Sequence, residues 1–194
     1  RMQNGLVMDE HGLSVYPDRP YQAHLKIFYY RSIENEQPIP FEESILFQDE
    51  YLIIADKPHF LPVMPAGTYL QETLLVRLKR RTGIETLVPM HRIDRETAGL
   101  VVFVIKPETR GAYQSLFLSK QVEKYYQAIA PYRHGLRFPM THKSRLQESD
   151  NFMQMEATEG EANSETLIEV LEHRDGLARY QLKPVTGKKH QLRA

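Results

Sequence analysis

Short apolar runs separated by polar breaks follow one another from residue 45 to residue 183, at a spacing typical of β-strands. Residues 45–47 and 51–55 flank a polar turn, which predicts a strand hairpin. Residues 101–105 form a continuous apolar run, as in a strand that is buried on both faces. Further strand-like segments follow at residues 122–130, 145–148, 152–157, 166–171 and 177–183.

Two segments instead carry the spacing of helices. Thr68, with Gln71 three residues later, resembles a capping box that opens a helix ending near Gly83. The inward face of this helix would carry Leu70, Leu74, Leu75 and Leu78. Pro107 at a first helical position predicts a second helix, whose inward residues would be Ala112, Tyr113, Leu116 and Phe117. Few helices among many hairpin-spaced strands predict an α+β fold, with a mostly antiparallel mixed sheet and a few flanking helices.

The first forty residues differ from the remainder of the chain in the spacing of their glycines, prolines and apolar residues. Glycines and prolines punctuate short apolar pieces there, which predicts a small β-rich N-terminal appendage and linker over residues 1–40. Residues 41–194 would then form the main domain. The chain begins at Arg1 rather than Met, so we expect it to be the remnant of something longer.

The composition is that of a globular protein, since 41% of the 194 residues are apolar and 26% are charged. The sequence contains neither an apolar run long enough for a membrane span nor a secretory signal. Its lack of cysteine excludes a disulfide framework and thiolate chemistry. We therefore expect a cytoplasmic protein that is monomeric and does not bind membranes.

Basic and acidic residues balance at 25 each, so the net charge does not indicate a nucleic-acid partner. Their distribution is more informative. Residues 120–145 contain six basic residues and one acidic residue, whereas residues 148–175 contain nine acidic residues and one basic residue. Such segregation can place one basic face on a neutral molecule, where it would attract RNA. A solvated surface with accidental charge blocks is the alternative explanation.

The densest group of polar side chains lies at residues 91–99, immediately before a predicted buried strand. Loops that are anchored by a rigid core element commonly carry active sites. Within this loop, Asp94 stands between Arg92 and Arg95. A charged surface loop without catalytic function is the alternative.

Residues 91–100, HRIDRETAGL, resemble the signature of the RluA-type pseudouridine synthases, whose usual form is HRLDRETSGL. Three further segments resemble that family in the expected order, at residues 49–63, 124–128 (KYYQA) and 186–193 (TGKKHQLR). The resemblance implies the catalytic fold of a pseudouridine synthase over residues 41–194, with its C-terminal part missing after Ala194. It also implies an isomerase that converts uridine to pseudouridine in ribosomal or transfer RNA, without a cofactor or a metal.

The resemblance assigns the chemistry to three residues. Asp94 would be the catalytic carboxylate, acting on the base or the sugar of a uridine that has been flipped out of the RNA. Arg193 would oppose the charge of this carboxylate, and Tyr126 would stack on the uracil ring. A structural salt bridge for Arg193 and a core position for Tyr126 are the alternatives.

RNA contacts are expected at Arg92, Lys124, Lys188 and Lys189. By resemblance, Arg92 enters the space vacated by the flipped base, and its planar guanidinium can stack on neighbouring bases. Lys188 and Lys189 replace the Arg-Thr pair that is commoner in the family. His91 and His190 are interpreted as structural, and the spacing of the His, Asp and Glu residues does not suggest a metal site.

Two other classes of protein remain open from the residues themselves. One is a non-catalytic RNA-binding module that keeps the scaffold; the intact Asp94 argues against it, and the expected loss of the C-terminal part argues for it. The other is a hydrolase that uses Asp94 with His91 or His190, for which a positioned water and a metal would be needed.

Overall fold

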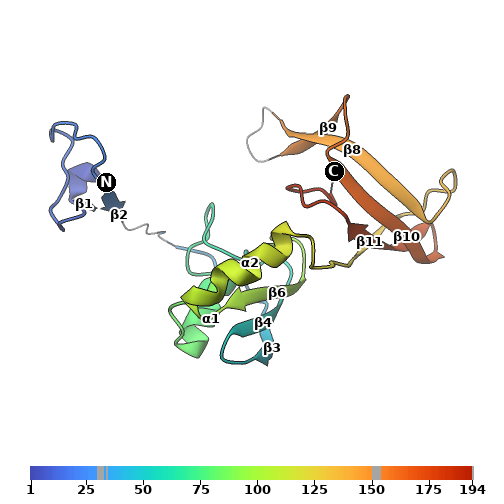
Figure 1. Cartoon of the computed structure of the whole chain (residues 1–194), viewed down its shortest axis with the longest axis horizontal. Coiled ribbons are helices and arrows are strands. Elements are labelled where there is room, and N and C mark those ends of the chain that lie inside the picture. The colour runs from blue at the N-terminus through green and yellow to red at the C-terminus, as the bar shows by residue number, and fades with distance from the viewer. Residues whose placement is uncertain (30–32, 34, 150–153, 194) are drawn as a thin grey trace. The chain divides into compact units, whose positions relative to one another are not determined.

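The computed structural model describes residues 1–29, 33, 35–149 and 154–193 (Figure 1). The chain divides into two compact units, Arg1–Gly111 and Ala112–Ala194. Its described strands pair in three sheets, and all of the pairings are antiparallel. Together with the described helices, this arrangement confirms the predicted α+β class.

Residues 1–29 contain a short 3-10 helix η1 (Met2–Asn4) and the antiparallel strands β1 (Val7–Asp9) and β2 (Ile27–Tyr29). A buried carboxylate organises the turn that follows β1. Asp9 accepts hydrogen bonds from the backbone N–H groups of His11 and Leu13 and from the guanidinium of Arg19. The Arg19 contact is the largest cause of the lowered pKa of Asp9. Residues 30–32 and 34 of the expected linker lie outside the described residues, and the expected domain boundary at residue 40 stays a prediction.

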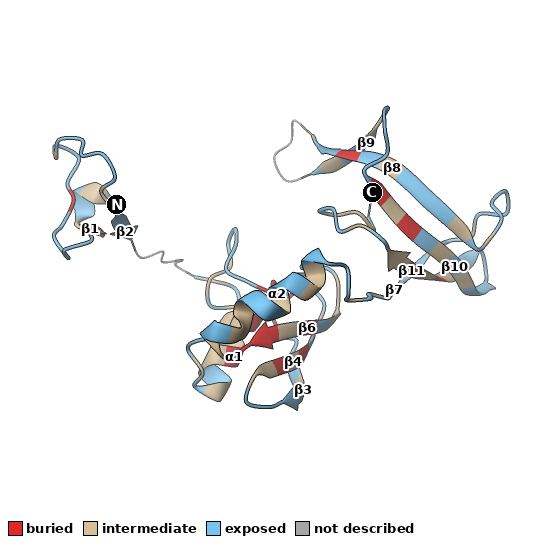
Figure 2. Ribbon diagram, in the orientation of Figure 1, coloured by how far each residue is buried: buried red, intermediate tan, exposed pale blue. Residues whose placement is uncertain are grey.

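The first unit contains a four-stranded sheet in the order β3-β4-β6-β5. Its strands are β3 (Ser44–Gln48), β4 (Leu52–Lys57), β5 (Val88–Pro89) and β6 (Gly99–Val104). The pairing of β3 with β4 confirms the predicted hairpin. The buried residues on β4 and β6 stand out in Figure 2. On β6, Val101, Phe103 and Val104 are buried and Val102 is half-buried, so the burial expected on both faces is met in part, whereas Leu100, before the predicted run, is 58% exposed.

The helix α1 (Leu74–Thr82) covers the core of this sheet. Its Leu74 and Leu78 are fully buried among apolar side chains of β4 and β6. It ends at Gly83, as predicted, in the left-handed conformation that glycine adopts readily (φ 71°). Its start differs from the prediction, because the N-cap is Thr73, whose hydroxyl accepts the N–H of Val76 at 3.4 Å.

The capping box that the sequence suggested at Thr68 and Gln71 is therefore wrong, and the physical reason is a distant carboxylate. Glu36 accepts hydrogen bonds from three successive backbone N–H groups, those of Leu70, Gln71 and Glu72. These contacts hold the segment before α1 in a non-helical conformation, and Leu70 consequently lies outside the helix.

The second unit contains a five-stranded sheet in the order β7-β11-β10-β8-β9. Its strands are β7 (Tyr126–Pro131), β8 (Met140–Glu148), β9 (Met155–Thr158), β10 (Ser164–Arg174) and β11 (Leu177–Pro184). The unit boundary in the chain falls within α2 (Arg110–Leu118), which follows the 3-10 turn η2 (Pro107–Thr109) of the first unit and confirms the predicted role of Pro107.

Several details of the second unit differ from the sequence prediction. Ala112 was expected to face inward and is exposed. The strand expected over residues 122–130 begins only at Tyr126. Before it, the carboxylate of Glu123 binds the ammonium of Lys183 at 2.6 Å and the hydroxyl of Tyr125 at 3.0 Å. The first residues of the segment expected at 152–157 lie outside the described residues.

Candidate active site

The loop that carries Asp94 runs from the end of β5 to Gly99, the first residue of β6. Asp94 is half-buried, and its carbonyl oxygen accepts the N–H of Thr97 at 3.1 Å, which closes a turn. Arg92 is exposed on the same loop. His91 Nε2 accepts the backbone N–H of Val102 at 3.3 Å, so the ring ties the loop to β6 and supports the structural role expected for it.

A buried lysine lies beneath this loop. The Lys57 side chain at the end of β4 is 0% exposed, and its ammonium donates to the carbonyls of Pro58 (2.9 Å), Leu61 (2.7 Å) and Arg95 (3.1 Å). Burial lowers the pKa of Lys57 from 10.5 to about 8, while the nearby charges of Glu96 and Asp94 act in the opposite direction. Lys57 thus fixes the backbone beside Asp94 and places a positive charge near its carboxylate.

A second contact fixes the same loop from outside. His59 Nδ1 lies 2.6 Å from the carbonyl oxygen of Glu96, at hydrogen-bonding distance. The side chain of Glu96 pairs with the neighbouring Arg95 at 3.2 Å. The Asp94 loop is therefore held at two successive residues by the last side chain of β4 and by one from the segment that follows it.

Sequence reasoning missed both Lys57 and His59 as individual site residues. A local signal for Lys57 existed, because alternate residues of a strand share one face. Ile53 and Ala55 are buried on β4, and the same alternation carries Lys57 into the core. A lysine in phase with buried apolar residues predicts a satisfied internal charge. His59 gave no comparable signal.

In the second unit, one glutamine organises the loop that follows β11. The amide oxygen of Gln191 accepts the hydroxyl of Thr186 (2.8 Å) and the N–H of Lys188 (3.0 Å). Its amide nitrogen donates to the carbonyl of Glu165 (3.0 Å) and the hydroxyl of Thr166 (2.9 Å) on β10. Four well-formed hydrogen bonds therefore fasten the loop that carries Lys188 to the sheet.

The expected catalytic residues of the second unit lie at its sheet and on this loop. Tyr126 is the first residue of β7, is half-buried and packs with Leu192 against a small apolar cluster. Arg193 is exposed at the end of the loop, and its N–H donates to the carbonyl of His190 at 2.9 Å.

Two of the expected RNA-binding lysines also meet this loop. The Lys124 ammonium lies close to Gly187 in this loop. A side chain at position 187 would bring its Cβ within 3.7 Å of the ammonium nitrogen. Lys189 is exposed and pairs with Glu148 of β8 at 3.4 Å. Together with Lys188, these side chains place positive charge along one loop, as phosphate binding requires.

The expected site residues are thus divided between the two units. Asp94 and Arg92 lie in the first unit, whereas Tyr126 and Arg193 lie in the second with the three lysines. The second unit brings the 186–193 loop and Lys124 together. The meeting of Asp94 with Tyr126 and Arg193 in one pocket stays a prediction.

The described residues offer neither a metal site nor a membrane-spanning helix. In the described ranges of the chain, no three His, Asp or Glu side chains gather closely enough to hold a metal ion. Among the helices that the structure describes, none has both the length and the apolar character for a membrane crossing.

Comparison with known proteins identifies the family. The model of the family described as RNA pseudouridylate synthase matches residues 51–194, which include both loops described above. The chain therefore belongs to this family, whose members are isomerases. This membership confirms the resemblance seen in the sequence and argues against the hydrolase alternative.

Individual relatives carry the same description. The chain is 32% identical over 168 residues to tRNA pseudouridine synthase C of Vibrio parahaemolyticus, covering 79% of this chain and 68% of that protein. It is 37% identical over 102 residues to an uncharacterized RNA pseudouridine synthase of Synechocystis, covering 53% of this chain and 35% of that protein. The structure of human RNA pseudouridylate synthase domain containing 4 shares 30% identity with a TM-score of 0.60, covering 77% of this chain and 61% of that chain.

The chain thus spans about a third of the Synechocystis relative and six tenths of the human structure. A second human structure, RNA pseudouridylate synthase domain containing 1, shares the fold with a TM-score of 0.65 at 21% identity.

Proposed function

We propose that this protein converts uridine to pseudouridine within RNA, with Asp94 as the catalytic carboxylate. The observation that carries the proposal is the family match over residues 51–194 combined with the anchoring of the Asp94 loop. A loop that is fixed at Arg95 and Glu96 holds the adjacent carboxylate in a defined position, as catalysis demands. Names of the relatives favour transfer RNA as the substrate over ribosomal RNA.

The reaction is an isomerisation, so every atom of the nucleotide is retained. The bond between N1 of uracil and C1′ of ribose breaks, the ring turns, and a bond forms between C5 and C1′. The proton leaves C5 and N1 gains one. A carboxylate can act as the nucleophile or as the proton acceptor in these steps, and Asp94 supplies a carboxylate for either role.

Asp94 is proposed to act with partners from the second unit. The ring of Tyr126 would stack on the uracil, and the guanidinium of Arg193 would stabilise the ionised form of Asp94. The base must leave the RNA helix to reach the carboxylate, and Arg92 would occupy the vacated space. Lys124, Lys188 and Lys189 would bind phosphates and thereby orient the RNA. The cytoplasmic location, the monomeric state and the absence of a cofactor stay predictions.

The test is the substitution Asp94→Asn, which keeps the shape of the side chain and removes its charge. The variant should fold and bind RNA but form no pseudouridine when incubated with bulk cellular RNA. Asp175→Asn is the matched control, because the Asp175 side chain is 83% exposed in a turn and pairs only with its neighbour Arg174 among the ion pairs of the described residues. Pseudouridine formation at the wild-type rate by Asp94→Asn would refute the proposal. Retained RNA binding without pseudouridine in the wild-type protein would instead support the non-catalytic module.

A further inference from the structure

Phe60 has a backbone conformation that a bulky residue rarely adopts. Its φ is 68°, in the left-handed region where glycine is favoured and a side chain with a Cβ is strained. Strained residues of this kind cluster at functional sites, where the surrounding structure holds them in place. Glycine would adopt this backbone conformation without strain. The presence of phenylalanine instead indicates that its ring has a role at this position.

Burial in the core does not supply that reason, because Phe60 is 49% exposed. Its ring lies 6.0 Å from the ring of Phe41 and 6.0 Å from that of His59, measured between centroids. Phe41 is itself 46% exposed. These three side chains, Phe41, His59 and Phe60, form a partly exposed aromatic cluster.

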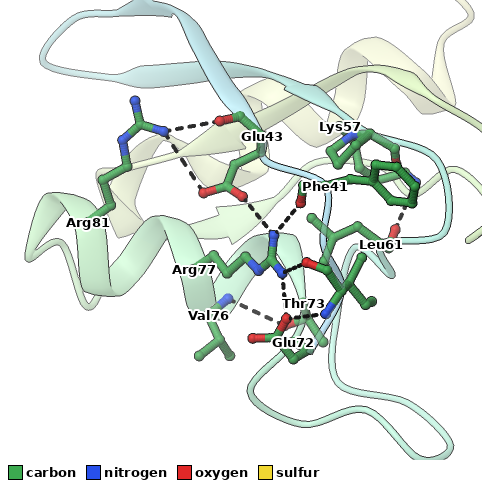
Figure 3. Close-up of polar contacts among 11 residues, drawn as sticks. Phe41, Glu43, Lys57, Leu61, Glu72, Thr73, Val76, Arg77 and Arg81 are labelled. Carbon is green, nitrogen blue, oxygen red and sulfur yellow. Dashed lines mark hydrogen bonds and ion pairs between the residues drawn. The ribbon is translucent and has the colours of Figure 1, made fainter. Parts of the chain in front are cut away.

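A buried or half-buried cation holds the backbone at or next to each phenylalanine. Figure 3 shows Arg77 at the carbonyl of Phe41 and Lys57 at the carbonyl of Leu61, the residue after Phe60. Lys57 donates to the carbonyls of Pro58 and Leu61, one on each side of the His59–Phe60 pair. Arg77 donates to the carbonyl of Phe41 at 2.7 Å, and its guanidinium is fixed in turn by two carboxylates. Rings on such a rigid base lose little conformational entropy when they bind a partner.

The aromatic cluster is joined directly to the Asp94 loop. His59 contacts the carbonyl of Glu96, and the ammonium of Lys57 that supports Phe60 also binds the carbonyl of Arg95. The side chain of Arg95 is 46% exposed and lies over the ring of Tyr69 at 5.8 Å. Partly exposed aromatic rings next to a loop that carries an exposed guanidinium are a combination that suits unpaired nucleobases, which bind through stacking and cation–π contacts.

We propose that the aromatic cluster of Phe41, His59 and Phe60 is a stacking platform for unpaired RNA bases that flank the target uridine. The inference rests on the proposed function in taking RNA as the substrate. The strain at Phe60 then has an explanation. The backbone conformation favours glycine, but RNA binding requires an aromatic ring at this position.

The test replaces Phe60 by glycine, which removes the ring and relieves the strain. Phe60→Gly should therefore melt at a temperature equal to or above that of the wild type, whereas its Kd for RNA should rise roughly 5- to 150-fold, the range for loss of one stacked base. The probe is a short single-stranded oligoribonucleotide that carries 2-aminopurine, whose fluorescence is quenched on stacking. Phe60→Tyr should retain both the affinity and the quenching.

Phe47→Ala is the matched control, because Phe47 in β3 is 48% exposed and should not contribute to binding. The salt dependence of binding should be unchanged in Phe60→Gly, since no charge is removed. Phe41→Ala is an independent second test of the same platform and should also raise the Kd for RNA.

Unchanged affinity and quenching in both Phe60→Gly and Phe41→Ala would overturn the inference. A fall in affinity that is matched by a fall in melting temperature in both variants would also overturn it, because it would indicate a structural role. Failure of the stacking platform and failure of the proposed function can be told apart, because they are measured by different assays. Pseudouridine formation by Asp94→Asn would refute the catalytic assignment, and the binding measurements would still decide the platform.

Discussion

Replacement of Lys57 by methionine removes a buried charge and three hydrogen bonds while it keeps most of the volume of the side chain. In the wild type, the ammonium satisfies the carbonyls of Pro58, Leu61 and Arg95 in a site that is closed to solvent. Methionine cannot donate to any of them. The substitution therefore separates two opposing contributions to the free energy of unfolding.

Both contributions can be estimated from the structure. A buried carbonyl that loses its donor costs about 1–3 kcal/mol, which applies in full to Leu61. The contacts with Pro58 and Arg95 are only partly buried, so the loss of their donor costs less. In the other direction, burial lowers the pKa of Lys57 from 10.5 to about 8. At about 1.4 kcal/mol per pKa unit, this shift corresponds to about 3 kcal/mol that disfavours the charged form and that methionine does not carry. We expect Lys57→Met to lower the free energy of unfolding by about 1–2 kcal/mol at neutral pH.

The pH dependence gives the sharper measurement. Because the folded-state pKa of Lys57 is about 8 and the unfolded-state pKa is near 10.5, the unfolded state binds more protons between these values. The contribution of Lys57 to stability therefore rises with pH across this window. The stability difference between wild type and Lys57→Met should widen by about 2 kcal/mol, at most, from pH ~7 to pH ~9.5.

Urea unfolding of both proteins at several pH values measures this difference, and other titrating groups cancel in the comparison. Lys79→Met is the control, because Lys79 on α1 makes only a long 3.7 Å contact with the exposed Glu85 among the described ion pairs. The difference between wild type and Lys79→Met should not change with pH. A constant difference for Lys57→Met as well would show that Lys57 is not held as a desolvated cation, and the reasoning would fail.

Two further predictions concern the second unit. Tyr126→Phe should reduce turnover much more than stability, because the ring still packs while the hydroxyl is lost; normal turnover per folded molecule with a sharp fall in melting temperature would make Tyr126 a core residue only. Replacement of both Lys188 and Lys189 by alanine should reduce the slope of log K against log salt for single-stranded RNA by about 1.4, at about 0.7 for each phosphate contact. An unchanged slope in a filter-binding titration would place the RNA elsewhere.

The agreement between sequence and structure was best where short-range rules apply. The β3–β4 hairpin follows from two apolar runs and a polar turn between them, and Gly83 ends α1 because glycine tolerates the left-handed conformation. The segments around Asp94 and Gln191 could be recognised because a family signature is contiguous in the chain. Each of these signals lies within about ten residues and needs no knowledge of what packs against it.

The start of α1 shows what lies beyond such rules. Thr68 and Thr73 both offer a capping hydroxyl, and the choice between them is made by Glu36, whose carboxylate binds the N–H groups of residues 70–72 from more than thirty positions away. A local pattern cannot contain that contact. The same holds for Gln191, whose amide nitrogen reaches Glu165 and Thr166 on β10.

The sequence by itself determined the class of fold, the family and the loop that carries Asp94, because these depend on alternation, turn chemistry and contiguous residues. Only the tertiary structure decided how that loop is held. Lys57 becomes its anchor because β4 carries the side chain into a closed core, where the ammonium binds two carbonyls of the next segment, Pro58 and Leu61, and the carbonyl of Arg95 in the Asp94 loop. A buried charge must find its partners inside the protein, and the partner that ties Lys57 to the Asp94 loop, the carbonyl of Arg95, lies 38 residues away in the chain.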